Sequence, residues 1–396
     1  MAEIARKLPA AEWCSRDDLM RLVEVLGADN MRWVGGAVRD TLLGSGAHDI
    51  DAATTHQPAE VIRRLDEAGI RSVPTGIAHG TVTAVLEGGH VEITTLRYDT
   101  ATDGRHAEVA FTADWREDAA RRDFTINALY AHPMTLEVFD WFGGLEDLAA
   151  SRVRFIGDAR ERIREDHLRI LRYYRFQARF GSELDADAEE ACAELAPTLK
   201  GLSRERVGWE LQNLLTVTDP VATVRRMAER GVLGVVLPEA GEAELDAFEA
   251  LVQAEAEAGL PPSPIRRLAA LLPADPRVAE TLAARLRLST AMRKRLVTAA
   301  KRDGAPGDPR ALAFRLGREE AFDRLLLAGE STAPIEGWEI PQFPLKGGQV
   351  VERGVKAGPE VARVLNTVQD RWIDEGFPDA ERVHAMLDEL LAAERT

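Results

Sequence analysis

The pattern of hydrophobic and polar positions changes near residue 150 of the chain. Before this point, short apolar runs predict β-strands at 32–34, 50–53, 81–86 and 91–96. The last two runs are separated by four residues that include consecutive glycines, a composition that suits a hairpin turn. The first part of the chain is therefore expected to form a small mixed sheet with helices.

From residue 158 onward, apolar residues recur at helical spacing. In the segment 159–180 they alternate with arginines, and the spacing predicts one long helix. Further amphipathic helices follow, separated by segments rich in proline and glycine that we expect to act as hinges, at 259–264, 303–309 and 333–348. Together the two patterns predict an α+β fold, with a mixed-sheet part followed by an all-helical part.

Composition and charge narrow the class of protein. A chain of 396 residues is too long for one ordinary core and suggests two to four packed units. The hydrophobic fraction of 45% and the charged fraction of 29% are typical of globular proteins. The net charge of −16, taken alone, argues against a polyanion such as nucleic acid as the main partner.

The cysteines and the absence of long apolar runs indicate a compartment. Cys14 and Cys192 are too few and too far apart in sequence for a disulfide framework or a thiolate metal cluster. The N-terminal residues lack the pattern of a secretion signal, and no uncharged apolar run approaches the ~18 residues of a membrane span. We expect a cytoplasmic protein that neither is secreted nor crosses a membrane.

A pair of glycines and a pair of aspartates lie close together in the first part of the chain. Gly35 and Gly36 allow the backbone to approach a bulky anion, and the helix expected after them directs free amide groups towards it. Asp49 and Asp51 are two apart in a strand, so their carboxylates share one face and repel each other. Mg²⁺ beside a triphosphate relieves this repulsion, and Glu92 in another strand could complete the site.

Each pair alone is a weak signal, because pairs of acids at strand ends are usually only solvated and Glu92 also fits an exposed strand position. Their combination within residues 35–51 is stronger. Neither a P-loop nor a Gly-x-Gly-x-x-Gly fingerprint offers another phosphate site. A single His48-Asp49 dyad does not make a metal-phosphohydrolase motif.

Four segments, in order, resemble the motifs of the class II tRNA nucleotidyltransferase and poly(A) polymerase family, which is part of the DNA polymerase β superfamily. They are 35–40 with Asp49 and Asp51, then 121–129, 140–148 and 165–176, with weaker matches at 203–211 and 344–358. The resemblance covers most of the chain. It implies a catalytic head at 1–150, a base-recognising neck at 151–215, a helical body at 216–302 and a tRNA-binding tail at 303–396.

The resemblance also implies which residues bind the nucleotide: Gly35, Gly36, Arg39, Arg122, Asp123, Asn127, Asp166, Arg169, Arg172 and Arg175. Arg122 suits phosphate, while Asp123 and Asn127 suit the ribose hydroxyls. Asp166 and Arg169 would act as a protein template, because a carboxylate accepts a hydrogen bond from the exocyclic amine that cytosine and adenine share. With Arg172 and Arg175, spaced by three, they are expected to follow one face of a helix.

The implied activity is the addition of C, C and A to tRNA 3′ ends from CTP and ATP, without a nucleic-acid template. Asp49 and Asp51 would hold Mg²⁺, and one of these carboxylates or Glu92 would help to activate the terminal hydroxyl. A poly(A) polymerase, a CC-only or A-only enzyme, and a catalytically silent RNA-binding protein are the alternatives. The segment 75–81 lacks the basic, aromatic character of poly(A) polymerases and favours CCA addition.

The distribution of charge along the chain makes a tRNA partner compatible with the negative net charge of the whole protein. Between residues 152 and 179 there are nine arginines and four acids, at the place where nucleotide and RNA end should meet. The net charge therefore excludes indiscriminate nucleic-acid binding but allows one RNA to be held in a defined basic groove. No protein partner is implied.

Overall fold

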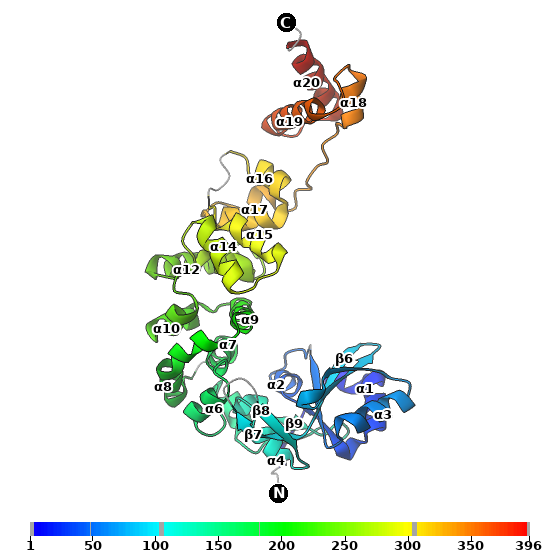
Figure 1. Cartoon of the computed structure of the whole chain (residues 1–396), viewed down its shortest axis with the longest axis vertical. Helices are drawn as coiled ribbons and strands as arrows, with labels where there is room; N and C mark the ends of the chain where they lie inside the picture. Colours follow the sequence, from blue (N-terminus) through cyan, green and yellow to red (C-terminus); the bar gives the residue numbers. More distant parts are fainter. Residues whose placement is uncertain (1–3, 48, 103–106, 182, 303–306, 394–396) are drawn as a thin grey trace. The chain divides into compact units, whose positions relative to one another are not determined.

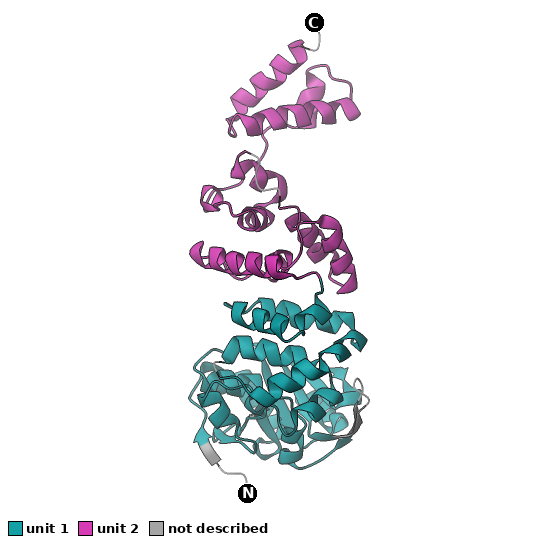
Figure 2. Ribbon diagram, turned by 90° about the vertical axis from the view of Figure 1, so that its left-hand side faces the viewer, with its two compact units in different colours: residues 1–238 teal, residues 239–396 magenta. Residues whose placement is uncertain are grey.

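The computed structural model describes residues 4–47, 49–102, 107–181, 183–302 and 307–393. The chain divides into two compact units, Met1–Pro238 and Glu239–Thr396 (Figure 2). This boundary falls inside the segment 216–302 that the sequence suggests as a helical body. The division into head, neck, body and tail thus stays a prediction.

Unit 1 begins with the mixed sheet expected from the sequence (Figure 1). Eight strands follow the order β1-β10-β9-β2-β3-β6-β5-β4, and β3 pairs with β6 in parallel. Their bounds are β1 (Ile4–Lys7), β2 (Met31–Val34), β3 (Ile50–Thr54), β4 (Arg71–Gly76), β5 (Thr81–Leu86), β6 (Gly89–Thr95), β9 (Tyr130–Ala131) and β10 (Glu137–Phe139). A separate two-stranded sheet consists of β7 (Arg97–Thr102) and β8 (Ala107–Phe111). The four predicted strands and the β5–β6 hairpin are confirmed.

Short helices complete this sheet region. They are α1 (Asp17–Leu26), α2 (Gly36–Leu42), α3 (Pro58–Glu67), α4 (Trp115–Ala120) and α5 (Gly144–Ala149), with single turns η1 (Glu12–Ser15), η2 (Ala28–Asn30), η3 (Ile77–His79) and η4 (Thr125–Asn127). Helix α3 packs against α1 and against β4 and β5. Buried apolar side chains such as Val34, Ala53 and Tyr130 form a core around β2 and β3. This core fixes the strand ends that carry the predicted site.

The rest of unit 1 is helical. It contains α6 (Ala159–Glu165), α7 (Arg169–Phe180), α8 (Ala186–Leu195), η5 (Ala196–Gly201), α9 (Arg204–Leu215), α10 (Val221–Glu229) and α11 (Leu233–Val236). The prediction of one helix over 159–180 is wrong, because the helix breaks at Asp166. This residue is extended, with φ −150° and ψ 105°, and its side chain accepts a hydrogen bond from the Leu168 amide at 3.1 Å. Such a local bond competes with helical pairing.

Unit 2 is helical throughout its described residues. Its elements are α12 (Glu242–Glu257), α13 (Pro264–Ala270), α14 (Pro276–Arg285), α15 (Thr290–Ala299), α16 (Pro309–Leu316), α17 (Arg318–Leu327), η6 (Ala333–Ile335), α18 (Gly347–Glu352), α19 (Pro359–Asp374) and α20 (Ala380–Ala393). The first expected hinge lies largely between α12 and α13, the third includes η6 and the start of α18, and part of the second lies outside the described residues.

Buried contacts of two kinds hold unit 2 together. Between α12, α13 and α17, the buried Arg266 contacts both Glu255 and Asp323. Near the C-terminus, Trp372 on α19 lies in an apolar cluster with Phe343 and residues of α18 and α20. In the described part of the chain, no helix combines the length and the apolar character that crossing a bilayer requires.

Candidate active site

The three carboxylates predicted as catalytic lie together in one cavity. Parallel pairing of β3 with β6 sets Asp51 directly opposite Glu92, and Asp49 immediately precedes β3. The cavity has a volume of about 310 Å³ and is lined by these three residues with Ile50 and His90. The strand register therefore brings together side chains that are more than 40 positions apart in the sequence.

This cavity holds negative charge without a neutralising partner. Among the described residues, Asp49, Asp51 and Glu92 make no side-chain hydrogen bond or ion pair. Burial and the nearby Glu92 raise the pKa of the partly buried Asp51 to about 6, against an opposing effect of Arg122. A site of this kind favours a bound cation, because the cation removes the mutual repulsion of the carboxylates.

The residues present fit Mg²⁺ as part of a shared coordination sphere. Within the described residues, no three His, Cys, Asp or Glu side chains are arranged as a complete metal site. Mg²⁺ is usually held by one or two carboxylates together with substrate phosphates and water, not by an all-protein cage. Asp49 and Asp51 provide that number of carboxylates, and a nucleotide triphosphate would supply the remaining oxygen ligands.

A glycine turn connects β2 to α2 beside an arginine. Gly35 has φ 71° and ψ −124°, a conformation that residues with a side chain avoid, and α2 begins at the next residue without a side-chain cap. A Cβ atom on Gly35 would lie 3.6 Å from Nη1 of Arg122. The uncapped amides of the first helical turn and this guanidinium form a surface suited to phosphate.

Two residues that the sequence did not single out hold Arg122 in place. Its Nε donates to the Tyr130 hydroxyl at 2.8 Å, and Nη2 lies 3.5 Å from the carboxylate of Asp118. The Tyr130 hydroxyl in turn donates to Asp118. Asp118 stands four residues before Arg122, a spacing at which helical ion pairs form, so it could have been found from the sequence. Tyr130 offers no comparable signal.

Asp123 and Asn127 are fixed by a buried network. Asp123 accepts hydrogen bonds from the Asn127 amide at 3.0 Å and from Arg172 Nε at 2.8 Å. Burial acts to raise the pKa of Asp123, but Arg172 and Asn127 more than offset it and hold the pKa at about 2. Arg39 is buried and donates to Asn127 Oδ1 at 2.5 Å. The structure thus places Arg39 against Asn127, whose orientation it sets.

The arginines of α7 are held by carboxylates and by one aromatic ring. Arg172 and Arg175 lie 3.5 Å and 2.9 Å from Glu210 of α9, whose pKa is raised by burial despite the two guanidinium groups. Both guanidinium groups, with that of Arg39, lie within 5.6 Å of the centroid of Phe176. Cation–π contacts of this kind fix otherwise flexible side chains.

The expected template pair is arranged differently from the sequence prediction. Asp166 does not lie on the helix face that carries Arg169, because the helix is broken there. Its carboxylate instead accepts from Arg206 of α9 at 2.7 Å. Arg169 donates to Glu165 at 2.5 Å and to the Arg121 carbonyl at 3.1 Å. Of the four residues expected on one helix face, only the three arginines therefore lie on α7. Arg206 of α9 is an additional residue beside the candidate base-recognition group.

The segment 140–148 has a structural role in this fold. The carboxylate of Asp140 accepts hydrogen bonds from the backbone amides of residues 142–145, at 2.8 to 3.1 Å. Asp147 is fully buried and pairs with Arg152 and Arg154, each at 2.8 Å. These contacts stabilise the turn that leads from the sheet to α6.

Comparisons with known proteins agree with this geometry. Residues 31–154 match the family model described as "Poly A polymerase head domain", and residues 181–243 match "Probable RNA and SrmB- binding site of polymerase A". The chain is 35% identical to CCA tRNA nucleotidyltransferase 1, mitochondrial, of Mus musculus, over 94% of this chain and 90% of the relative. It is 45% identical to the CCA-adding enzyme of Leuconostoc mesenteroides over 185 residues, which are 46% of this chain and 45% of the relative.

A solved structure extends the similarity to the whole fold. The crystal structure of the Bacillus stearothermophilus CCA-adding enzyme in complex with CTP superposes with a TM-score of 0.75 at 26% identity. The match covers 96% of this chain and 99% of that chain. The mixed sheet and the helices that follow it are thus a known arrangement.

Proposed function

The chain belongs to the family of CCA tRNA nucleotidyltransferases, and we propose that it adds two cytidines and one adenosine to tRNA 3′ ends from CTP and ATP, without a nucleic-acid template. The observation that supports this most strongly is the set of three unpaired carboxylates in one cavity. Asp49, Asp51 and Glu92 lie in the same unit as the Gly35 turn, whose backbone suits a triphosphate.

The proposed reaction is an in-line displacement at the α-phosphate. The terminal 3′-oxygen of the tRNA forms a bond to the α-phosphorus while the bond from this phosphorus to the bridging oxygen breaks, which releases pyrophosphate. The hydroxyl proton passes to a carboxylate of the cavity, which is that of Asp49, Asp51 or Glu92. Mg²⁺ held by Asp49 and Asp51 would lower the pKa of the hydroxyl and neutralise charge on the leaving group.

Recognition of the nucleotide is divided between two parts of unit 1. Arg122 would contact the phosphates, and Asp123 with Asn127 would face the ribose. Asp166, oriented by Arg206, would accept from the exocyclic amine of cytosine or adenine and would form the protein template with Arg169, while Arg172 and Arg175 would hold the base or the triphosphate. We further propose that the protein acts in the cytoplasm, although similar relatives include mitochondrial enzymes.

Incorporation assays with the purified full chain test this function. A tRNA that lacks its CCA end is incubated with Mg²⁺ and labelled CTP, ATP, UTP or GTP, and products are resolved by length. We expect two additions with CTP alone, three with CTP and ATP, and one with ATP on a tRNA that ends in CC. A long adenosine tract would instead establish a poly(A) polymerase. A stop after two cytidines when both CTP and ATP are present would establish a CC-only enzyme. No incorporation under any of these conditions would overturn the proposal.

A further inference from the structure

The solvent-facing side of α9 carries a tryptophan that the folding of the helix does not explain. Trp209 is 55% exposed, whereas Val207, Leu211 and Leu214 of the same helix are buried. Trp209 follows Arg206 by three positions and precedes Asn213 by four, so the three side chains share one face. Tryptophan is enriched at interaction surfaces, because its ring offers a large apolar face and its N–H a hydrogen-bond donor.

Contacts connect this face to the candidate base-recognition residues. At one end, Arg206 binds the carboxylate of Asp166 at 2.7 Å. Next to it, the guanidinium of Arg175 lies 5.6 Å from the centroid of the Trp209 ring. Asn213 donates from its side chain to the carbonyl of Trp209 at 2.9 Å, which fixes the amide beside the indole. Trp209 therefore stands one helical turn beyond the residue that orients Asp166.

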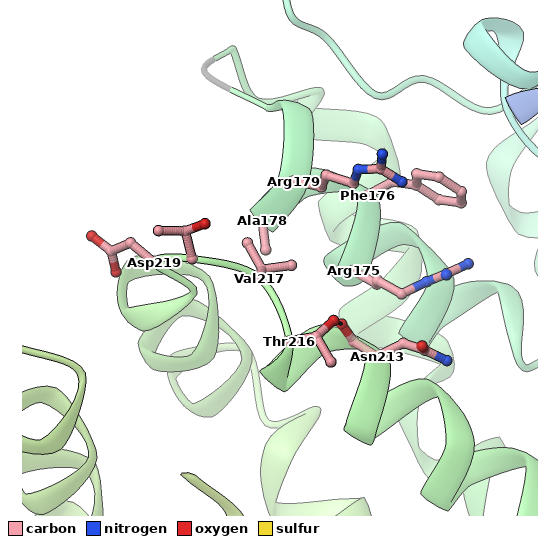
Figure 3. A pocket seen from close by; sticks show the side chains of 9 residues that line it. Arg175, Phe176, Ala178, Arg179, Asn213, Thr216, Val217 and Asp219 are labelled. Carbon is pink, nitrogen blue, oxygen red and sulfur yellow. Dashed lines mark hydrogen bonds between the residues drawn. The ribbon is translucent and has the colours of Figure 1, made fainter. Parts of the chain in front are cut away.

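A cavity continues the surface beyond Trp209. It has a volume of about 440 Å³ and lies between α7 and the end of α9. Figure 3 shows the side chains of Arg175, Arg179 and Asn213 pointing to the same side, while Asp219 points away from them. Arg179 also reaches Asp40 of α2 at 3.1 Å. The cavity thus offers two guanidinium groups and an amide, and Arg175 joins it to the Trp209 ring.

This combination matches the chemistry of single-stranded RNA. An exposed aromatic ring stacks on any base, and neighbouring arginines contact the backbone phosphates. We propose that the Trp209 ring stacks on an unpaired base at the 3′ end of the RNA substrate, next to the incoming nucleotide that Arg175 would hold. The inference rests on the proposed function, and it assigns to α9 the RNA end, not the nucleotide, whose base would face Asp166.

Kinetics of two Trp209 variants test the proposal. In Trp209→Ala we expect the KM for a tRNA lacking CCA to rise about tenfold, with kcat and the KM for CTP changed less than twofold, because only stacking of the RNA end is lost. Trp209→Phe retains an aromatic face and should restore most of the tRNA affinity. Tyr98→Ala removes an exposed aromatic ring elsewhere in unit 1, 43% exposed, and serves as the matched control.

The outcomes separate this inference from the proposed function. If the unchanged protein incorporates no CTP, the proposed function fails; if it adds CCA and Trp209→Ala leaves the KM for tRNA unchanged, only the inference fails. An equal rise in Tyr98→Ala would also overturn it. A tRNA with 5-iodocytidine at its 3′ end provides a second measurement in the unchanged full chain. We expect its photo-crosslink within the α9 peptide that contains Trp209, and a crosslink confined to other peptides would contradict the proposal.

Discussion

The acidic side chains in the β3–β6 cavity and Asp123, which contacts Arg172 of α7, have opposite surroundings. In the cavity, Asp49, Asp51 and Glu92 make no ion pair with any other described residue, and Asp51 has a raised pKa. Beneath α7, Asp123 binds Arg172 and Asn127, and its pKa is held at about 2. Asp51 is half-buried beside the exposed Asp49 and Glu92, whereas Asp123 is buried; among the described residues, only Asp123 is paired with an opposite charge.

This difference indicates separate tasks for the two regions. An unpaired set of carboxylates costs stability and gains a partner only when a cation binds, so its retention points to chemistry. A buried carboxylate that is paired and hydrogen-bonded fixes the orientation of its partner, which suits recognition of a fixed shape, and its removal leaves a buried charge without that partner. Substitution of a cavity carboxylate should therefore lower activity and raise stability. Substitution of Asp123, which pairs with Arg172 of α7, should lower both activity and stability.

The largest effect is expected for Asp51→Asn. Incorporation of CTP should fall by at least about a thousandfold, because one carboxylate for Mg²⁺ and for the hydroxyl proton is lost. The fold should be retained and become more stable at neutral pH, since the substitution removes a charge that is costly to bury and that repels Glu92. Measured kcat and thermal unfolding in EDTA check both parts. Near-normal turnover, or a clear loss of stability, would contradict the assignment.

The gain in stability expected for Asp51→Asn should depend on pH. With a folded-state pKa of about 6, above its ordinary value of 3.8, Asp51 keeps a proton in the folded protein that it loses in the unfolded chain. Its contribution to stability is thus present below pH 4 and is lost as the pH rises through 6. Relative to the unchanged protein, Asp51→Asn should gain little at pH 4 and up to ~3 kcal/mol at pH 7.5. A gain that is equal at both pH values would exclude this cause.

Asp123→Ala is expected to have the next largest effect, and here stability should fall. Removing the Asp123 carboxylate leaves Arg172 with the longer 3.5 Å contact to Glu210 in place of a close pair, which costs ~3 kcal/mol. The lowered pKa means that this contribution is present above pH 4 and lost only as the pH falls through 2, so neutral pH shows the full loss. The KM for CTP should rise more than tenfold as Asn127 loses its orientation. Denaturant titration and steady-state kinetics measure both changes.

Asp123→Asn provides the matched comparison for this loss. The amide keeps the size of the side chain and an oxygen for the Asn127 hydrogen bond, but it has no charge for Arg172. Its destabilisation should lie between those of the unchanged protein and Asp123→Ala. If both variants were as stable as the unchanged protein, the pairing beneath α7 would have no energetic role.

The sequence predicted the parts of the site that depend on local spacing. Gly35, Gly36 and the Asp49–Asp51 pair follow from residue types placed next to a strand, whereas the position of Glu92 opposite Asp51 comes from the pairing of β3 with β6. The fold class was also predictable, because the hydrophobic period changes from that of strands to that of helices. These features require no knowledge of which distant segments pack together.

The remaining features depend on contacts between distant segments. The break at Asp166 was missed because both sides of it have helical spacing, and Arg206, which holds its carboxylate, lies 40 positions away. Tyr130 supports Arg122 only because a single-turn helix returns the chain to the sheet. Partners of this kind carry no signal in spacing, since tertiary packing selects them.

Arg206→Ala should have the smallest effect on stability and an effect on base choice. The pair with Asp166 is partly exposed, so its loss should change the free energy of unfolding by less than ~1 kcal/mol. Without it, only the Leu168 amide among the described residues donates to the Asp166 carboxylate, whose orientation is then less fixed, and the ratio of UTP to CTP incorporation should rise several-fold. Arg204→Ala in the same helix, where the guanidinium contacts only a backbone carbonyl among the described residues, is the control and should leave the ratio unchanged. Equal ratios in both variants would mean that Asp166 is oriented without Arg206. The selectivity for the base would then depend on residues of α7 and not on the pair with α9.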